Sequence, residues 1–291
     1  TSEANSMSSD ERMSLLDALV AAGIEPLRMM PGTGCCSITE TVTLTAHAVK
    51  HGCAGVLMLP PFYYKDVSEE GLYGYFSEVV ERVADARLRI YLYHIPPVAK
   101  VGITPKLVER LLKAYPNAIA GMKDSSGDWH NTKTFLEDFG RTGFDVFVGS
   151  ESFLLANMCN GGAGTISATA NINPAAIFAL YKSAKSQAPN PKLQRNTNQR
   201  SAVAVASAVT ADEGLEAQQT RLNAIREVFS SKKFPSMIAA IKQAIAICTN
   251  EPEWARVRPP LIALTPAQAN LLAAELQRIG FAMNAIKRTE N

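Results

Sequence analysis

The sequence lacks the features that mark several large classes of protein. It contains no run of about 18 consecutive apolar residues, so a membrane-spanning segment and a membrane partner are not expected. Its 29 basic and 27 acidic residues leave a formal net charge of +2 without a long basic block, so nucleic acid is not an expected partner. No charged segment followed by an apolar one opens the chain, so we expect a cytoplasmic protein, or a mitochondrial one if its source is eukaryotic.

Cysteine is scarce and shows no spacing that suggests a metal site or a disulfide framework. The five cysteines form no C-x-x-C pair, which favours a reducing compartment. The four histidines do not cluster with them, so no zinc site is expected. His47 and His51 stand four residues apart on a predicted helix. That spacing could bind a metal ion, but we interpret the pair as ordinary helix surface.

Nucleotide-binding motifs are absent too, whereas alternation of strands and helices is pronounced. Neither G-x-G-x-x-G after a first strand nor G-x-x-x-x-G-K-[ST] occurs, which disfavours the commonest open-sheet nucleotide binders. Short apolar runs instead alternate with amphipathic segments of helical length. Such strand–helix units predict a parallel sheet, either open or closed as a barrel. The predicted strands are 27–31, 55–59, 90–93, 118–122, 146–148 and 164–167.

The order of these segments predicts an α/β fold, a (β/α)8 TIM barrel with a C-terminal helical extension. A barrel of this type needs eight strands, and six are predicted, so we expect an N-terminal strand–helix unit to be missing from this chain. We expect the barrel over 1–185, an irregular insertion or linker over 186–214 and a helical region over 215–291. Helices are predicted within that region at 215–232, 234–248 and 266–281.

Several helix starts are marked by capping residues. Ser8 and Glu11 can form a capping box at the start of the first helix. Thr104-Pro105, Asn173-Pro174 and Thr265-Pro266 each place a capping side chain before a proline that suits the first helical turn.

One lysine stands at the end of a predicted strand, where a TIM barrel carries its active site. Lys123 follows the apolar run 118–122 and precedes a polar turn. Burial disfavours an ammonium ion, and a neutral amine is the nucleophile that forms a Schiff base with a ketone. The alternative interpretation is a lysine that extends its charged end into solvent.

Tyrosines end or follow neighbouring predicted strands. Tyr93 ends the strand before that of Lys123, and neighbouring strands lie about 5 Å apart. A phenol at that place can relay protons during formation and cleavage of carbon–carbon bonds. Tyr63 and Tyr64 follow another strand and could extend the relay. Alternatively, Tyr93 is a core residue, and the other two are interface residues.

The main chain near Gly149 and Ile166 is a further candidate for contact with a small acid. Gly149 follows the predicted strand 146–148, Ile166 lies near the end of the predicted strand 164–167, and glycine lets a ligand approach the backbone closely.

These residues resemble the dihydrodipicolinate synthase and N-acetylneuraminate lyase family of Schiff-base aldolases. GMKDSSGD at 121–128 is similar to the family's stretch around the Schiff-base lysine, and YHIP at 93–96 is similar to its Tyr-x-x-Pro motif. TSEANS at 1–6 resembles the end of the family's Gly-Thr-Thr-Gly-Glu loop. Further stretches match in the same order: GTG at 32–34, PPFYY at 60–64, FVGSE at 147–151 and GTISATANINP at 164–174.

The resemblance implies a lyase that acts on pyruvate or another 2-oxo acid without a metal or organic cofactor. Lys123 would form the Schiff base, and Tyr93 would shuttle protons. Tyr63 or Tyr64 would join the relay, in many members from a neighbouring subunit of a homotetramer built as a dimer of dimers. The substrate carboxylate would rest on Thr1 and Ser2. The main chain near Gly149 and Ile166 would close the site.

The chain also departs from the family pattern. Synthases that use aspartate semialdehyde typically carry arginine five residues after the shuttle tyrosine, whereas this position is Val98. Lys100 could supply a charge there but lacks the bidentate geometry of arginine. GMKDS followed by VGSESFL looks closer to 4-hydroxy-2-oxoglutarate aldolases. The first strand and the first threonine of the loop precede Thr1 in the family.

Four functions therefore stay open at this point. The favoured one is a 4-hydroxy-2-oxoglutarate aldolase-like enzyme, and the nearest alternative is 4-hydroxy-tetrahydrodipicolinate synthase. A non-catalytic barrel kept for binding is a third. A metal-dependent aldolase or phosphate-binding barrel is a fourth, and it predicts acidic or histidine ligands at strand ends that the sequence does not show.

Overall fold

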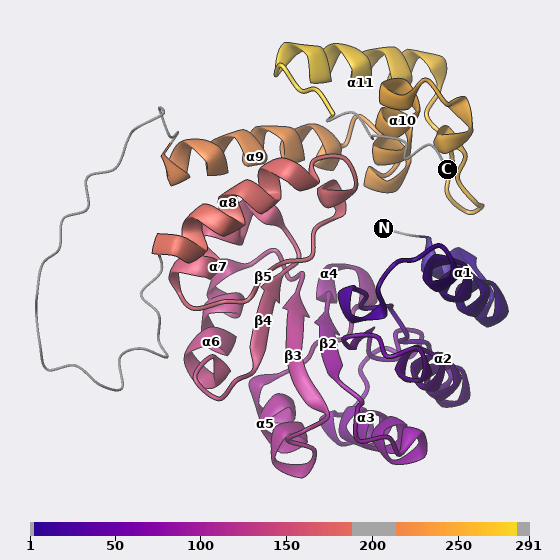
Figure 1. Cartoon of the computed structure of the whole chain (residues 1–291), viewed down its shortest axis with the longest axis vertical. Helices are drawn as coiled ribbons and strands as arrows, with labels where there is room; N and C mark the ends of the chain where they lie inside the picture. The colour runs from indigo at the N-terminus through magenta and orange to yellow at the C-terminus, as the bar shows by residue number, and fades with distance from the viewer. Residues whose placement is uncertain (1–2, 188–213, 284–291) are drawn as a thin grey trace, which may run out of the picture.

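The centre of the molecule is a parallel sheet whose strands follow one another in chain order (Figure 1). A computed structural model describes residues 3–187 and 214–283. Every neighbouring pair of strands is parallel, as expected of consecutive strand–helix units. The strands are β1 (Val56–Met58), β2 (Ile90–His94), β3 (Ile119–Asp124), β4 (Asp145–Val148) and β5 (Gly164–Thr165).

Five of the six predicted strands are confirmed, and the first is wrong. Residues 27–31 do not form a strand, because Pro26 begins a short 3-10 helix, η2 (Pro26–Arg28), and Pro31 has no N–H to donate to a ladder. The end of this segment, at Pro31 and Gly32, nevertheless lies beside β1. Leu57 donates its N–H to the Pro31 carbonyl oxygen at 2.9 Å, and Gly32 forms an isolated bridge with Leu57.

Helices cover the outer side of the sheet and extend beyond its end (Figure 1). Ser8 and Glu11 form the predicted capping box, and Thr104 and Thr265 cap their helices as predicted. The helices are α1 (Ser9–Ala21), α2 (Ile38–Lys50), α3 (Glu69–Val83), α4 (Pro96–Ala99), α5 (Pro105–Ala114), α6 (Trp129–Phe139), α7 (Leu154–Cys159), α8 (Pro174–Gln187), α9 (Leu215–Ser230), α10 (Met237–Thr249) and α11 (Pro266–Arg278).

Alternation along the strands gives the sheet two different faces. Ile90, Leu92 and His94 of β2 are buried against the helices, whereas Tyr91 and Tyr93 are half-buried and face the other way. The face that carries the two tyrosines corresponds to the interior of a barrel. The opposite face and its helices form one continuous hydrophobic core.

The last three helices pack around a separate core beside the carboxyl ends of the strands (Figure 1). This core joins Ile172 to apolar side chains of α9, α10 and α11. The helices predicted at 215–232, 234–248 and 266–281 therefore form, although α10 begins three residues late because Ser236 caps it. Most of the predicted insertion, residues 188–213, lies outside the described residues, so the division into regions stays a prediction.

No helix within residues 3–187 and 214–283 is both long enough and apolar enough to cross a membrane.

Candidate active site

The predicted lysine and tyrosine lie side by side on neighbouring strands. Lys123 of β3 is the register partner of Tyr93 of β2. The Lys123 Nζ donates a hydrogen bond to the Tyr93 Oη over 3.2 Å and lies 4.3 Å from the centre of the tyrosine ring. Lys123 is 9 % exposed, so this lysine does not extend into bulk solvent.

The surroundings of this pair follow from strand register and alternation. Phe147 of β4 is the partner of Lys123 on the other side, so the lysine stands between two aromatic residues. Two residues earlier, Gly121 pairs with Asp145. A Cβ on Gly121 would lie 2.3 Å from the Asp145 carbonyl oxygen, so only glycine allows the strands to approach so closely just before the lysine.

Tyr91 lies on the same face of the sheet as Tyr93, two residues earlier on β2. Its Oη donates a hydrogen bond to an Asp145 carboxylate oxygen at 3.2 Å. Burial, together with the nearby negative charge of Asp145, raises the pKa of Tyr91 to about 12. Tyr91 therefore stays protonated at neutral pH. Its hydroxyl links β2 to β4, whereas the hydroxyl of Tyr93 contacts Lys123.

Asp124 fixes the end of β3 from the opposite face. Its buried carboxylate accepts hydrogen bonds from the Ser126 N–H at 2.8 Å, the Asn131 amide at 3.0 Å and the Thr132 hydroxyl at 2.6 Å. These partners tie the strand end to the start of α6, which begins after Asp128. Because Asp124 follows Lys123 directly, this network limits the movement of the lysine backbone.

His94 supports the same end of the sheet. It is buried, and its Nδ1 accepts a hydrogen bond from the Ile103 N–H at 2.9 Å. Burial lowers the pKa of His94, and the negative charge of Asp124 acts in the opposite direction. His94 is therefore a neutral structural group behind Tyr93.

Gly149 and Ile166 lie at the carboxyl ends of β4 and β5, but their N–H groups are already engaged. Gly149 donates to the Asp124 carbonyl oxygen at 2.7 Å, and Ile166 donates to the Val148 carbonyl oxygen at 3.0 Å. A Cβ on Gly149 would lie 1.8 Å from the Ser125 Oγ. Close packing thus explains this glycine, and neither N–H is free to bind a carboxylate.

The remaining predicted residues lie away from the pair or outside the described part of the chain. Tyr63 and Tyr64 are 74 % and 68 % exposed, with ring centres 5.4 Å apart. Within the described residues neither tyrosine hydrogen-bonds to Lys123 or Tyr93. Val98 is exposed on α4. Thr1 and Ser2 lie outside the described residues.

The sequence interpretation did not find a buried ion pair at the same end of the sheet. Glu151, 1 % exposed, follows β4, and Arg226 of α9 donates a hydrogen bond to its carboxylate at 3.0 Å. The hydroxyls of Ser167 and Thr169 also donate to this carboxylate. Gln219 of α9 donates to the Glu151 carbonyl oxygen at 2.9 Å. The group fastens α9 to the carboxyl ends of β4 and β5.

Comparison with known proteins places this geometry in a family. The model of the Dihydrodipicolinate synthetase family matches residues 1–211. The chain belongs to this family. It is 32 % identical over 280 residues to an uncharacterised DapA-like lyase from Chloroflexus aurantiacus, a match that covers 96 % of this chain and 82 % of that protein. It is 38 % identical over 184 residues to a 4-hydroxy-tetrahydrodipicolinate synthase from Thermus thermophilus. That second match covers 63 % of this chain and 60 % of the synthase.

Solved structures confirm the fold. Dihydrodipicolinate synthase from Agrobacterium tumefaciens superposes with a TM-score of 0.75 at 28 % identity, covering 95 % of this chain and 84 % of that one. A prophage protein of the same family from Escherichia coli K12, solved with pyruvate, gives 0.75 at 24 % identity, with 95 % and 83 % covered. The predicted TIM-barrel class with a helical C-terminal extension is therefore confirmed. The family also confirms the predicted enzyme class, a carbon–carbon lyase.

Proposed function

We propose that the chain is a class I aldolase in which Lys123 forms a Schiff base with a 2-oxo acid. The observation that carries this proposal is the contact of the Lys123 Nζ with the Tyr93 Oη, on paired strands and away from bulk solvent. A primary amine beside a phenol is the pair that imine chemistry needs, because one group attacks the carbonyl and the other moves protons.

The proposed reaction proceeds through an imine. The Lys123 amine adds to the C2 carbonyl of a 4-hydroxy-2-oxo acid, and water leaves as the imine forms. A base removes the proton of the C4 hydroxyl, the C3–C4 bond breaks, and its electron pair moves to the iminium nitrogen. An aldehyde leaves, the enamine takes up a proton at C3, and hydrolysis releases pyruvate and restores the amine. Condensation is the same sequence in reverse.

Tyr93 is the proposed proton shuttle, since its Oη hydrogen-bonds to the reacting nitrogen and a phenol can both give and take a proton. Tyr64, assisted by Tyr63, is proposed to act on the site of a second copy of this chain. The exposure of both rings supports this role, because exposed aromatic residues favour interfaces. A homotetramer, a dimer of dimers, is the proposed assembly.

We propose that Thr1 and Ser2 contact the substrate carboxylate, and that Gly149 and Ile166 border the substrate by close packing. Ser2 and Thr1 carry hydroxyls suited to this role, whereas the two N–H groups near the strand ends are occupied. The carboxylate contact therefore depends on the N-terminal hydroxyls.

The proposed substrate is 4-hydroxy-2-oxoglutarate, which would yield pyruvate and glyoxylate. Two sequence features support this choice. GMKDS and VGSESFL are more similar to 4-hydroxy-2-oxoglutarate aldolases, and Val98 stands where synthases that use aspartate semialdehyde typically carry arginine. 4-Hydroxy-tetrahydrodipicolinate synthase is the second candidate, since the relative from Thermus thermophilus carries that name.

Side-by-side assays test the substrate. Pyruvate release from 4-hydroxy-2-oxoglutarate and condensation of pyruvate with aspartate semialdehyde are measured on the full chain, with and without a chelator. The proposal predicts chelator-resistant cleavage that is at least about 10-fold more efficient than condensation. Faster condensation would favour the synthase, activity lost with chelator would favour a metal-dependent aldolase, and pyruvate binding without turnover would favour a non-catalytic barrel.

A further inference from the structure

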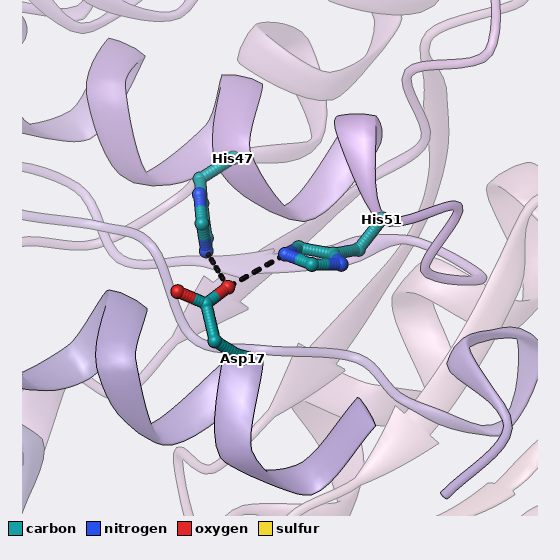
Figure 2. A group of neighbouring side chains, drawn as sticks. All are labelled: Asp17, His47 and His51. Atoms are coloured by element: carbon teal, nitrogen blue, oxygen red, sulfur yellow. Dashed lines mark hydrogen bonds and ion pairs between the residues drawn. The ribbon is translucent and has the colours of Figure 1, made fainter. Parts of the chain in front are cut away.

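Three side chains from two outer helices converge on one point far from the Lys123 chemistry. Asp17 comes from α1, and His47 and His51 come from α2 (Figure 2). The Asp17 Oδ1 lies 2.8 Å from the His47 Nε2 and 2.7 Å from the His51 Nε2. All three atoms lie within 4.8 Å of one another.

Helix geometry explains why these residues meet. Residues four apart lie one above the other on a helix, so His47 and His51 present their rings on one side of α2. Thr45, Ala48 and Val49 are buried against the barrel, so the histidines occupy a different part of the helix surface. α1 packs on α2 and brings Asp17 to them. Their exposed fractions, 20 %, 25 % and 53 % for His47, His51 and Asp17, leave room for water.

Hydrogen bonding alone does not satisfy this group. The His51 Nε2 hydrogen-bonds to the Asp17 Oδ1. The His47 Nε2 is buried and has no hydrogen bond, although the same oxygen lies only 2.8 Å away. The His47 Nε2 is therefore not engaged in a hydrogen bond, and in the tautomer that carries its proton on Nδ1 this nitrogen has a lone pair that can bind a metal ion.

We propose that Asp17, His47 and His51 bind one divalent transition-metal ion, such as Zn²⁺. Two imidazoles and a carboxylate are a ligand set that suits such ions, and water can complete the coordination at the exposed side. Ligand atoms about 2.0–2.1 Å from a metal are about 3.0–3.4 Å apart. Binding therefore requires the half-exposed Asp17 carboxylate to move outward by about half an ångström and the two imidazole rings to move closer together.

The site has a structural role, because it joins α1 to the barrel. Leu16 is the one buried residue of α1, so few apolar contacts hold this helix in place. Arg12 and Glu11 add polar contacts to Gly32 and Arg258. A metal ion that binds only the folded chain stabilises it by mass action. The inference is independent of the proposed aldolase reaction, which uses none of these residues.

Metal titration of the full chain tests the site. The protein, without a polyhistidine tag, is treated with chelator, dialysed and titrated with ZnCl₂ by calorimetry. We expect about one equivalent bound with a Kd near or below about 10 µM, and a Tm raised by about 5 °C at a 100-fold excess over Kd. Bound Co²⁺ is expected to give visible absorption bands typical of nitrogen and oxygen ligands.

Variants assign the ligands. His51→Ala and Asp17→Asn are each expected to weaken Zn²⁺ binding at least about 10-fold and to abolish the Co²⁺ bands, with aldolase activity unchanged. His130→Ala is the matched control, since His130 is an exposed histidine on α6, and it should bind as the parent does. No stoichiometric binding, or equal affinity in all variants, would overturn the site. The second result would assign the metal to other groups, such as the exposed Cys159 and Cys248.

Discussion

The interior end of the sheet and the outer surface around α1 both concentrate polar groups, but they hold them differently. Lys123 and Tyr93 are positioned by strand register, and their neighbours are buried. Asp17 is half-exposed and meets His47 and His51 only because two helices pack together. The first arrangement suits a reacting group, which must be held in place and shielded from water. The second suits a ligand set, which needs access to solvent and some freedom to move.

The largest contrast is expected between two lysines. Lys123→Ala removes the proposed nucleophile, so we expect kcat for retro-aldol cleavage to fall at least about 10³-fold. Lys133→Ala, on the exposed side of α6 beside Glu137, should change kcat less than about 2-fold. Steady-state assays with circular dichroism of both variants make this comparison. Comparable kcat values in folded protein would show that Lys123 is not the nucleophile.

Two tyrosines on the interior face sharpen the assignment. Tyr93→Phe removes the hydroxyl that contacts the Lys123 Nζ, so kcat is expected to fall about 10²-fold to 10⁴-fold with little change in KM. Tyr91→Phe, which loses the hydrogen bond to Asp145, should lower kcat less than about 10-fold. If the two variants were equally impaired, the hydroxyl of Tyr93 would have a structural role only.

Two ion pairs extend the comparison to stability. Arg226→Met leaves the Glu151 carboxylate buried without its cation, so we expect unfolding to become easier by about 2–4 kcal/mol. Arg258→Met breaks the bidentate pair with Glu11 at the exposed surface, where solvent screens charges, and its effect should be smaller than that of Arg226→Met. Urea unfolding at pH 7.5 measures both. A larger loss for Arg258→Met would contradict the view that burial separates the two regions.

The smallest expected effect concerns acid stability. Burial lowers the pKa of His94 in the folded chain, so below about pH 6.5 the unfolded chain binds more protons and stability falls as the pH falls. His94→Asn keeps an acceptor for the Ile103 N–H but does not titrate. Between pH 7.5 and 5.5 the parent should therefore lose more stability than the variant in urea unfolding. Identical losses would show that His94 is not the titrating group.

The sequence was sufficient to predict the Lys123–Tyr93 pair for a physical reason. Parallel strands in chain order bring successive strand ends together, so a lysine and a tyrosine at neighbouring ends must meet. The same reasoning failed for residues 27–31. An apolar run also fits a segment that is not a strand, and here Pro26 and Pro31 cannot donate the N–H hydrogen bonds of a β-ladder.

Pairs between distant elements could not be predicted. Glu151 and Arg226 are 75 residues apart, and their contact depends on where α9 packs against the barrel. Asp17 and His51 are 34 residues apart and depend on the crossing of α1 and α2. The histidine spacing was visible in the sequence, but the carboxylate that completes the group was not. The occupied N–H groups of Gly149 and Ile166 also required the register of β4 and β5.

Reductive trapping tests the central claim most directly. The full chain is incubated with pyruvate and borohydride, and the modified peptide is identified by mass spectrometry, with Lys123→Ala as the control. We predict one pyruvate-derived adduct per chain, located on Lys123 and absent from the variant. Folded protein that gains no adduct, or that carries it on another lysine, would contradict the proposed chemistry.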